Sequence, residues 1–150
     1  MRTQFGFAVL AACVLVGCRS ADPPEYLTAD ATHAEYLDAS VALDLPAGAA
    51  FPAPNHPSLA DDGKAIFYEA GSGRNDAQYF WYCAWAAEAL TSVDLRGALA
   101  NMERVELMEL WNALDSNGQT QFASQLALAK NGDLRQVESF VDVNCQADGA

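Results

Sequence analysis

The second half of the chain, after Gly71-Ser72-Gly73, carries a regular succession of helix start and stop signals. Capping residues followed by apolar residues three and four apart predict helices over residues 75–92, 95–114, 120–130 and 134–143. Asn117-Gly118 and Asn131-Gly132 are expected to end the second and third of these helices. Because the connections are short, successive helices should be antiparallel neighbours. We therefore expect a mainly α fold, a small antiparallel helical bundle of about four helices.

The first half of the chain predicts a minor two-stranded β element near the N-terminal side of the bundle. Residues 41–45 alternate in the manner of a half-buried strand, and residues 65–70 read as a second strand. Four prolines within residues 46–63 predict a long loop between them. Residues 18–40 are interpreted as a flexible tether, in which residues 28–39 form at most a marginal helix that needs tertiary support. The globular domain is then expected to span residues 41–150.

The chain is strongly acidic, with 20 Asp and Glu against 8 Lys and Arg and a net charge of −12. Such a surface repels the phosphates of nucleic acids and the headgroups of anionic lipids. The charge therefore argues against nucleic-acid binding and against membrane binding through a polybasic patch.

The N-terminus has the parts of a secretory leader. Arg2 precedes an apolar stretch over residues 5–16. This stretch is too short for a transmembrane helix, which needs roughly 20 residues, but it suits a signal peptide, which needs about 7 to 15. It ends in Leu15-Val16-Gly17-Cys18, which resembles the lipobox of bacterial lipoproteins at all four positions. An ordinary signal peptide with an accidental cysteine and an uncleaved helix are the alternatives.

The resemblance to bacterial lipoproteins implies a lipid anchor. In that family the leader, here residues 1–17, is cleaved as a signal peptide, and the thiol of the next residue, here Cys18, is joined to diacylglycerol. Residues 18–40 would then be the lipidated N-terminus and tether, and the protein would contact the membrane through its lipid. The location implied is the outer face of the cytoplasmic membrane, or an outer membrane if the cell has one. Two or three acyl chains hold a protein firmly without help from its charge.

Two cysteines remain once Cys13 is lost with the leader and Cys18 is lipidated. Export would place Cys83 and Cys145 in an oxidising compartment, and two cysteines allow only one pairing. We expect a Cys83–Cys145 disulfide. Two buried free thiols too far apart to bond are the alternative.

Residues 79–85 concentrate aromatic side chains on the first predicted helix. Consecutive residues turn by about 100° on a helix, so these side chains cannot share one face. Phe80 and Cys83, with Ala87 and Leu90, are expected to form the core stripe, which leaves Trp81 and Trp85 together on another side. Either that side is covered by the rest of the chain, or it is an exposed platform that binds a ligand. Trp81 and Trp85 are therefore the candidate ligand-binding residues.

Residue types that carry catalysis are sparse. His33 and His56 fall in the predicted tether and loop, neither has metal-ligand spacing to a cysteine, and the chain lacks a Gly-x-Ser-x-Gly elbow. We expect no enzyme, no cofactor and no metal site. The expected function is that of a non-catalytic, lipid-anchored envelope protein that contacts another envelope protein. The alternative is a lipoprotein that binds a small neutral or cationic ligand, or a glycan, on the aromatic helix. The oligomeric state stays open.

Overall fold

The fold is given by a computed structural model that describes residues 25–145 of the chain. Two short strands and a series of helices follow one another in the order β1 (Tyr26–Leu27), α1 (Ala29–Val41), β2 (Tyr68–Glu69), α2 (Ser72–Thr91), α3 (Leu95–Met102), the 3₁₀ helix η1 (Glu103–Leu107), α4 (Glu109–Ala113), α5 (Ser116–Lys130) and α6 (Arg135–Asn144). The prediction of a mainly helical fold with a small two-stranded antiparallel sheet is confirmed.

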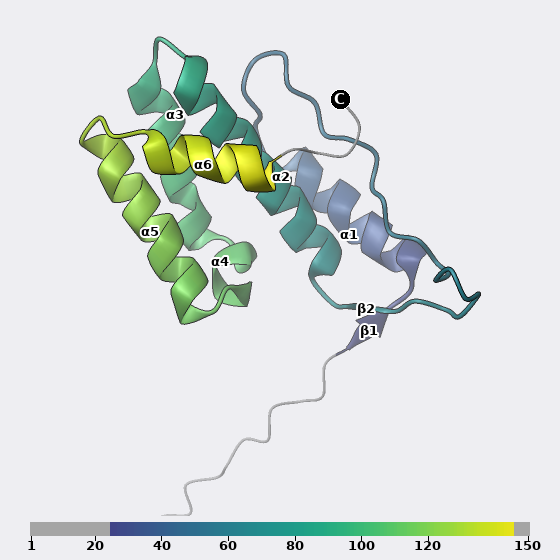
Figure 1. Cartoon of the computed structure of the whole chain (residues 1–150). Coiled ribbons are helices and arrows are strands. Elements are labelled where there is room, and N and C mark those ends of the chain that lie inside the picture. Colours follow the sequence, from purple (N-terminus) through teal and green to yellow (C-terminus); the bar gives the residue numbers. More distant parts are fainter. Residues whose placement is uncertain (1–24, 146–150) are drawn as a thin grey trace, which may run out of the picture.

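Helix α2 is the centre of the fold, and it contacts α1 on one side and α3, α4 and α6 on the others (Figure 1). Ala77, Trp81, Tyr82 and Ala86 have no exposed surface, because the surrounding helices cover more than one face of α2. A helix that is apolar over most of its circumference must be buried in this way. The arrangement is therefore wider than a simple four-helix bundle, since α1 adds a layer outside the helices of the second half.

Helix α1 packs tightly against the first turn of α2. A Cβ atom at Gly73 would lie 2.0 Å from the backbone oxygen of Thr32, so only glycine permits this approach. The carboxylate of Glu35 accepts hydrogen bonds from the backbone N–H of Gly71 at 2.9 and 3.0 Å, and it thereby caps the start of α2. Arg74 bridges Glu35 at 3.3 Å and Glu109 of α4 at 2.8 Å.

The expected flexible tether over residues 18–40 is wrong for the part that the structure describes. Thr28 caps α1, and the helix runs to Val41 with Ala29, Thr32 and Tyr36 buried. Its own sequence is weak, and contact with α2 supplies the tertiary support that a short helix requires. The folded domain thus begins near Glu25 and not at residue 41.

The β element joins different segments from those predicted. Strand β1 pairs antiparallel with β2, with Tyr26 opposite Glu69 and Leu27 opposite Tyr68. The expected strand over residues 41–45 is wrong, because α1 extends to Val41 and the following residues are irregular. The second expected strand, over residues 65–70, contains β2.

The predicted long helix over residues 95–114 is divided. Met108 has an extended conformation, with φ −99° and ψ 162°, which ends η1 and lets α4 begin. The side-chain oxygen of Gln78 on α2 accepts a hydrogen bond from the backbone N–H of Leu110 at 2.8 Å, and this satisfies one of the first amides of α4. Asn117-Gly118 does not end a helix as expected. Both residues lie in the first turn of α5, which Asp115 caps by accepting the N–H of Gly118 at 2.7 Å.

The C-terminal helices close the core against α2. The ring of Tyr82 lies 4.6 Å from that of Phe122 on α5 and 5.5 Å from that of Phe140 on α6, measured between centroids. Gly132 has φ +86° in the turn between α5 and α6, which agrees with the predicted Asn131-Gly132 stop. The Cys83–Cys145 disulfide is present, and it ties the end of α6 to the middle of α2.

Candidate functional site

The two candidate ligand-binding tryptophans do not form an exposed platform. Trp81 has no exposed surface and Trp85 is half-buried. Both indole N–H groups donate to the same backbone oxygen, that of Asp44, at 2.8 and 2.9 Å. The guanidinium of Arg104 lies 5.4 Å from the centroid of the Trp81 ring and covers it further. The interpretation of Trp81 and Trp85 as one exposed ligand-stacking surface is therefore wrong, because Trp81 is fully buried and both indole N–H groups are bonded within the fold.

The chain that covers the tryptophans is the irregular segment over residues 42–67, which we call the strap. It leaves the end of α1 and returns along that helix to β2 (Figure 1). Leu43, Leu45 and Phe51 of the strap pack against the core, and the Phe51 ring lies 5.3 Å from that of Phe80. Phe80 and Leu90 are only partly buried and Ala87 is exposed, so of the predicted core stripe only Cys83 is fully within the core.

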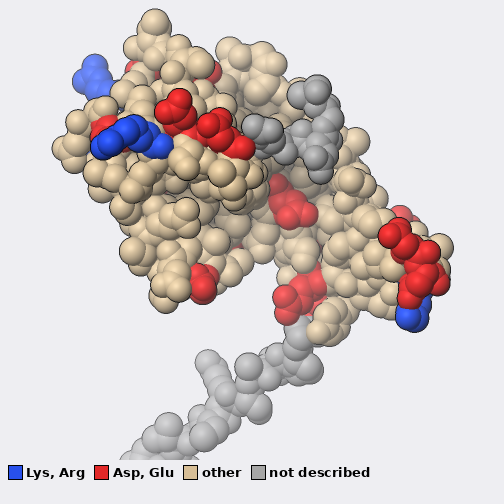
Figure 2. Space-filling model, in the orientation of Figure 1, with Lys and Arg blue, Asp and Glu red and all other residues tan. Residues whose placement is uncertain are grey.

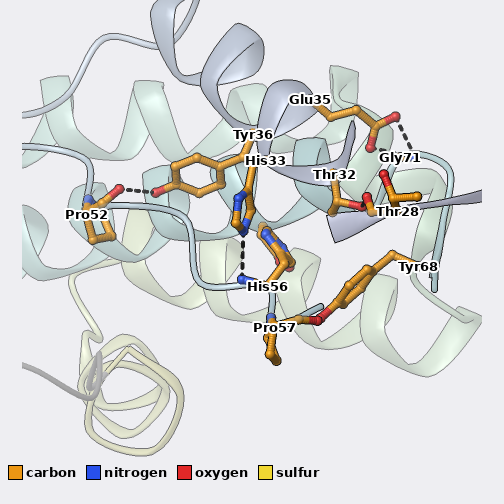
Figure 3. A network of polar contacts seen from close by, with 11 residues as sticks. Thr28, Thr32, His33, Glu35, Tyr36, Pro52, His56, Pro57, Tyr68 and Gly71 are labelled. Atoms are coloured by element: carbon orange, nitrogen blue, oxygen red, sulfur yellow. Dashed lines mark hydrogen bonds and ion pairs between the residues drawn. The ribbon is translucent and has the colours of Figure 1, made fainter. Parts of the chain in front are cut away.

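The structure also brings together His33 and His56 (Figure 3) and the carboxylate of Asp76, which are far apart in the sequence. His33 of α1 accepts the backbone N–H of His56 on its Nε2 at 3.0 Å, so this nitrogen carries no proton. The Nε2 of His56 lies 2.7 Å from Oδ2 of Asp76 on α2. The two imidazole centroids are 5.1 Å apart. Side chains from both α1 and α2 thus contact His56 in the strap.

Two tyrosines extend this network along the strap. The hydroxyl of Tyr36 donates to the backbone oxygen of Pro52 at 3.1 Å, and that of Tyr68 donates to the oxygen of Pro57 at 2.9 Å (Figure 3). Burial, together with the negative charge of Asp76, raises the pKa of Tyr36, so its hydroxyl keeps its proton and remains a donor. Proline cannot donate a backbone hydrogen bond, and its carbonyl is the group that these tyrosines use.

The histidine cluster has the ingredients of an acid–base site but holds them in structural contacts. His56 is 7% exposed, and its remaining ring nitrogen, Nδ1, is buried without a hydrogen-bond partner. The side chain of Asp76 is 60% exposed. Among the described residues no group of three or more His, Cys, Asp or Glu side chains could hold a metal ion. Within residues 25–145 no side-chain hydroxyl or thiol is hydrogen-bonded to either imidazole.

Sequence reasoning did not find this cluster. His33 and His56 are 23 residues apart, and His56 and Asp76 are 20 apart, which matches no local motif. Only the path of the strap brings these residues together, and no pattern in the sequence predicts that path.

The acidic residues of η1 and α4 do not converge on a cation. Glu103 pairs with Lys130 of α5, whereas Glu109 pairs with Arg74 of α2. Glu106 is exposed to solvent.

The predicted lipidation site, Cys18, and the leader lie outside the described residues. Within residues 25–145 no helix is both long enough and apolar enough to cross a membrane. Comparisons of the chain with protein-family models, with curated proteins and with solved structures found no significant match.

Proposed function

We propose that the chain is an exported lipoprotein, anchored in the membrane through Cys18, whose helical domain is a non-catalytic module that contacts another envelope protein. The observation that carries the proposal is the leader followed by Leu15-Val16-Gly17-Cys18. After cleavage, Cys18 would stand seven positions before Glu25, the first described residue. The membrane anchor and the folded domain would then be separated by a short linker.

The disulfide supports export. Cys83 and Cys145 bond at a sequence separation of 62, and such structural disulfides persist in oxidising compartments. Cytosolic thiol systems would keep the same pair reduced. A leader and a structural disulfide in one chain are independent indications of the same location.

The absence of catalysis is supported by how the reactive side chains are used. The imidazoles of His33 and His56 hold the strap, and the indoles of Trp81 and Trp85 bond the strap carbonyl at Asp44. These groups are fixed by contacts within the chain. A role in binding through the outer surface therefore fits the protein better than chemistry at an internal site.

The charge of the surface indicates the character of the partner. Lys64, Arg74, Lys130 and Arg135 each pair with a carboxylate. Because Asp and Glu outnumber Lys and Arg by 20 to 8, most acidic side chains have no basic partner. Figure 2 shows acidic side chains on several parts of one face and few basic ones. An envelope protein with a basic contact surface is the complementary partner, since such charges steer association.

The anchor is tested by metabolic labelling with an alkyne fatty acid in cells that produce the full chain. The wild type is expected to carry the label and to partition with membranes, whereas the Cys18→Ser variant loses both properties. Cys13→Ser is the matched control, because it removes the cysteine within the leader and leaves Leu15-Val16-Gly17-Cys18 intact. Label and membrane partitioning that survive in Cys18→Ser would refute the anchor.

The acidic contact is tested by cross-linking in intact cells. Two charge reversals are compared: Asp30→Lys with Asp38→Lys on α1, and Glu138→Lys with Asp142→Lys on α6, all at exposed positions. At least one pair is expected to reduce the yield of a discrete cross-linked product, with Cys18→Ser as the control for location. If neither pair changes the yield, the acidic surface is not the contact.

A further inference from the structure

We propose that the groove between α5 and α6 binds a neutral, hydroxyl-rich ligand of the saccharide class. The groove has a volume of about 350 Å³, which falls within the range of small-molecule sites. Helix α5 contributes two of its lining residues and α6 the others, namely Gln121, Gln125, Gln136, Ser139, Phe140, Val143 and Asn144. This site is separate from the histidine cluster and does not depend on the proposed envelope partner.

The lining indicates the chemistry of the ligand. None of the lining residues is charged, although the chain holds 28 charged side chains. A cationic or anionic ligand would find no opposite charge in this groove. Glutamine and asparagine amides each offer two N–H donors and an acceptor oxygen, and a serine hydroxyl can do both. Sugar hydroxyls also donate and accept, so these groups are complementary to a neutral saccharide.

Gln125 is the second observation that points to a ligand. It is 1% exposed, and its Nε2 has no hydrogen-bond partner. A buried N–H without a partner destabilises a fold, and an apolar side chain of similar size would avoid that penalty at this position. The unpaired Nε2 of this lining residue is explained if a ligand bound in the groove supplies the acceptor. We assign that acceptor to a ligand hydroxyl.

The walls of the groove are held firmly in the absence of a ligand. The Phe140 ring packs against Phe122 at 5.4 Å and against Tyr82 at 5.5 Å, so the apolar part of the lining is anchored in the core. The disulfide at Cys145 follows Asn144 directly and fixes the end of α6. Polar groups on two fixed helices are preorganised, which reduces the entropy lost on binding.

The experiment is an NMR titration of a ¹⁵N-labelled chain that begins at Arg19. This chain keeps every described residue, and all of the contacts described above lie among those residues. The probes are the neutral disaccharides N,N′-diacetylchitobiose and maltose, with spermidine and inorganic phosphate as charged probes. We expect a neutral probe to cause saturable shifts in the side-chain amides of Gln121, Gln125 and Gln136. The proposal is overturned if neither disaccharide does so, or if only a charged probe shifts these signals.

Variants separate binding from folding. Gln125→Leu is expected to weaken binding by about fivefold or more, the effect of losing one neutral hydrogen bond, while its melting temperature stays the same or rises. Gln136→Ala, at an exposed lining position, should weaken binding to a similar degree. Ser124→Ala on α5 is the control, because Ser124 is exposed and does not line the groove. Unchanged affinity in Gln125→Leu, or a lower melting temperature that indicates a satisfied native amide, would overturn the proposal.

Discussion

Removal of the Cys83–Cys145 disulfide should cause a large loss of stability whose size follows from the chain it closes. The two cysteines are 62 positions apart. For a loop of that length the loop-closure entropy gives about 4 kcal/mol at 25 °C. This approaches the whole net stability of many domains. The equilibrium ratio of folded to unfolded chain should therefore fall by a factor on the order of a thousand.

The measurement is urea unfolding followed by circular dichroism, on a chain that begins at Arg19. Oxidised wild type is compared with the same protein after reduction and with the Cys83→Ala/Cys145→Ala variant. Both altered forms should lose stability by similar amounts, because the effect lies mainly in the unfolded chain and not in the contacts of the sulfur atoms. A loss below about 1 kcal/mol in both forms would refute the entropic reasoning. A large loss in the alanine variant alone would assign the effect to packing at Cys83, which is 7% exposed.

Two further substitutions test local contacts. Gly73→Ala would place a methyl group 2.0 Å from the Thr32 oxygen, so the free energy of unfolding should fall by about 1–3 kcal/mol. Gly118→Ala should lower it less, because the nearest atoms to the new methyl group are side-chain atoms at 3.3 Å. Equal losses in the two variants would contradict the close approach at Gly73. Hydrogen bonds from Arg135 lower the pKa of Asp133 to about 2. The ionised carboxylate therefore stabilises the folded state above pH 4, and this stabilisation is lost as the pH falls toward 2. Arg135→Gln should raise that pKa, as measured by carboxyl ¹³C NMR, and an unchanged value would contradict the assignment.

The sequence predicted helices best where a local signal also determines the structure. Asp94 accepts the backbone N–H of Gly97, and α3 begins at residue 95, where the predicted helix over residues 95–114 begins. Gly132 adopts the positive φ that its position after a helix predicts. Such caps act within four residues of the chain, so the pattern alone contains the information.

The break in the predicted helix at Met108 could not be predicted from a local sequence pattern. Its apolar stripe continues through the break, and the contact that accompanies the new start is the bond from Leu110 to Gln78, which lies 32 residues earlier. The strand expected over residues 41–45 failed for a related reason. The alternating pattern was real, but the backbone there is held by the indoles of Trp81 and Trp85 rather than by a neighbouring strand.

In the candidate site, too, some features could be predicted from the sequence and others depend on long-range contacts. The cysteine pairing followed from counting, and it was predicted correctly. The histidine cluster depends on the path of a loop that contains no regular structure, and side-chain hydrogen bonds to backbone atoms fix that path. Neither spacing nor periodicity encodes contacts of this kind.

The covalent link from Cys83 to Cys145 also decides how the domain would respond to a mechanical pull. A load applied ahead of Glu25 passes through the bond from Ala70 N–H to the Glu25 oxygen and through the β1–β2 pair, which leads directly into α2. A load at the other end enters α2 at Cys83 and bypasses the helices between the two cysteines. Stretching the oxidised chain therefore leaves 62 residue steps unextended, a contour length on the order of 200 Å. Between Glu25 and Cys145, tension would be carried by the chain from β1 to Cys83 and by the disulfide, and the residues between the two cysteines would carry none.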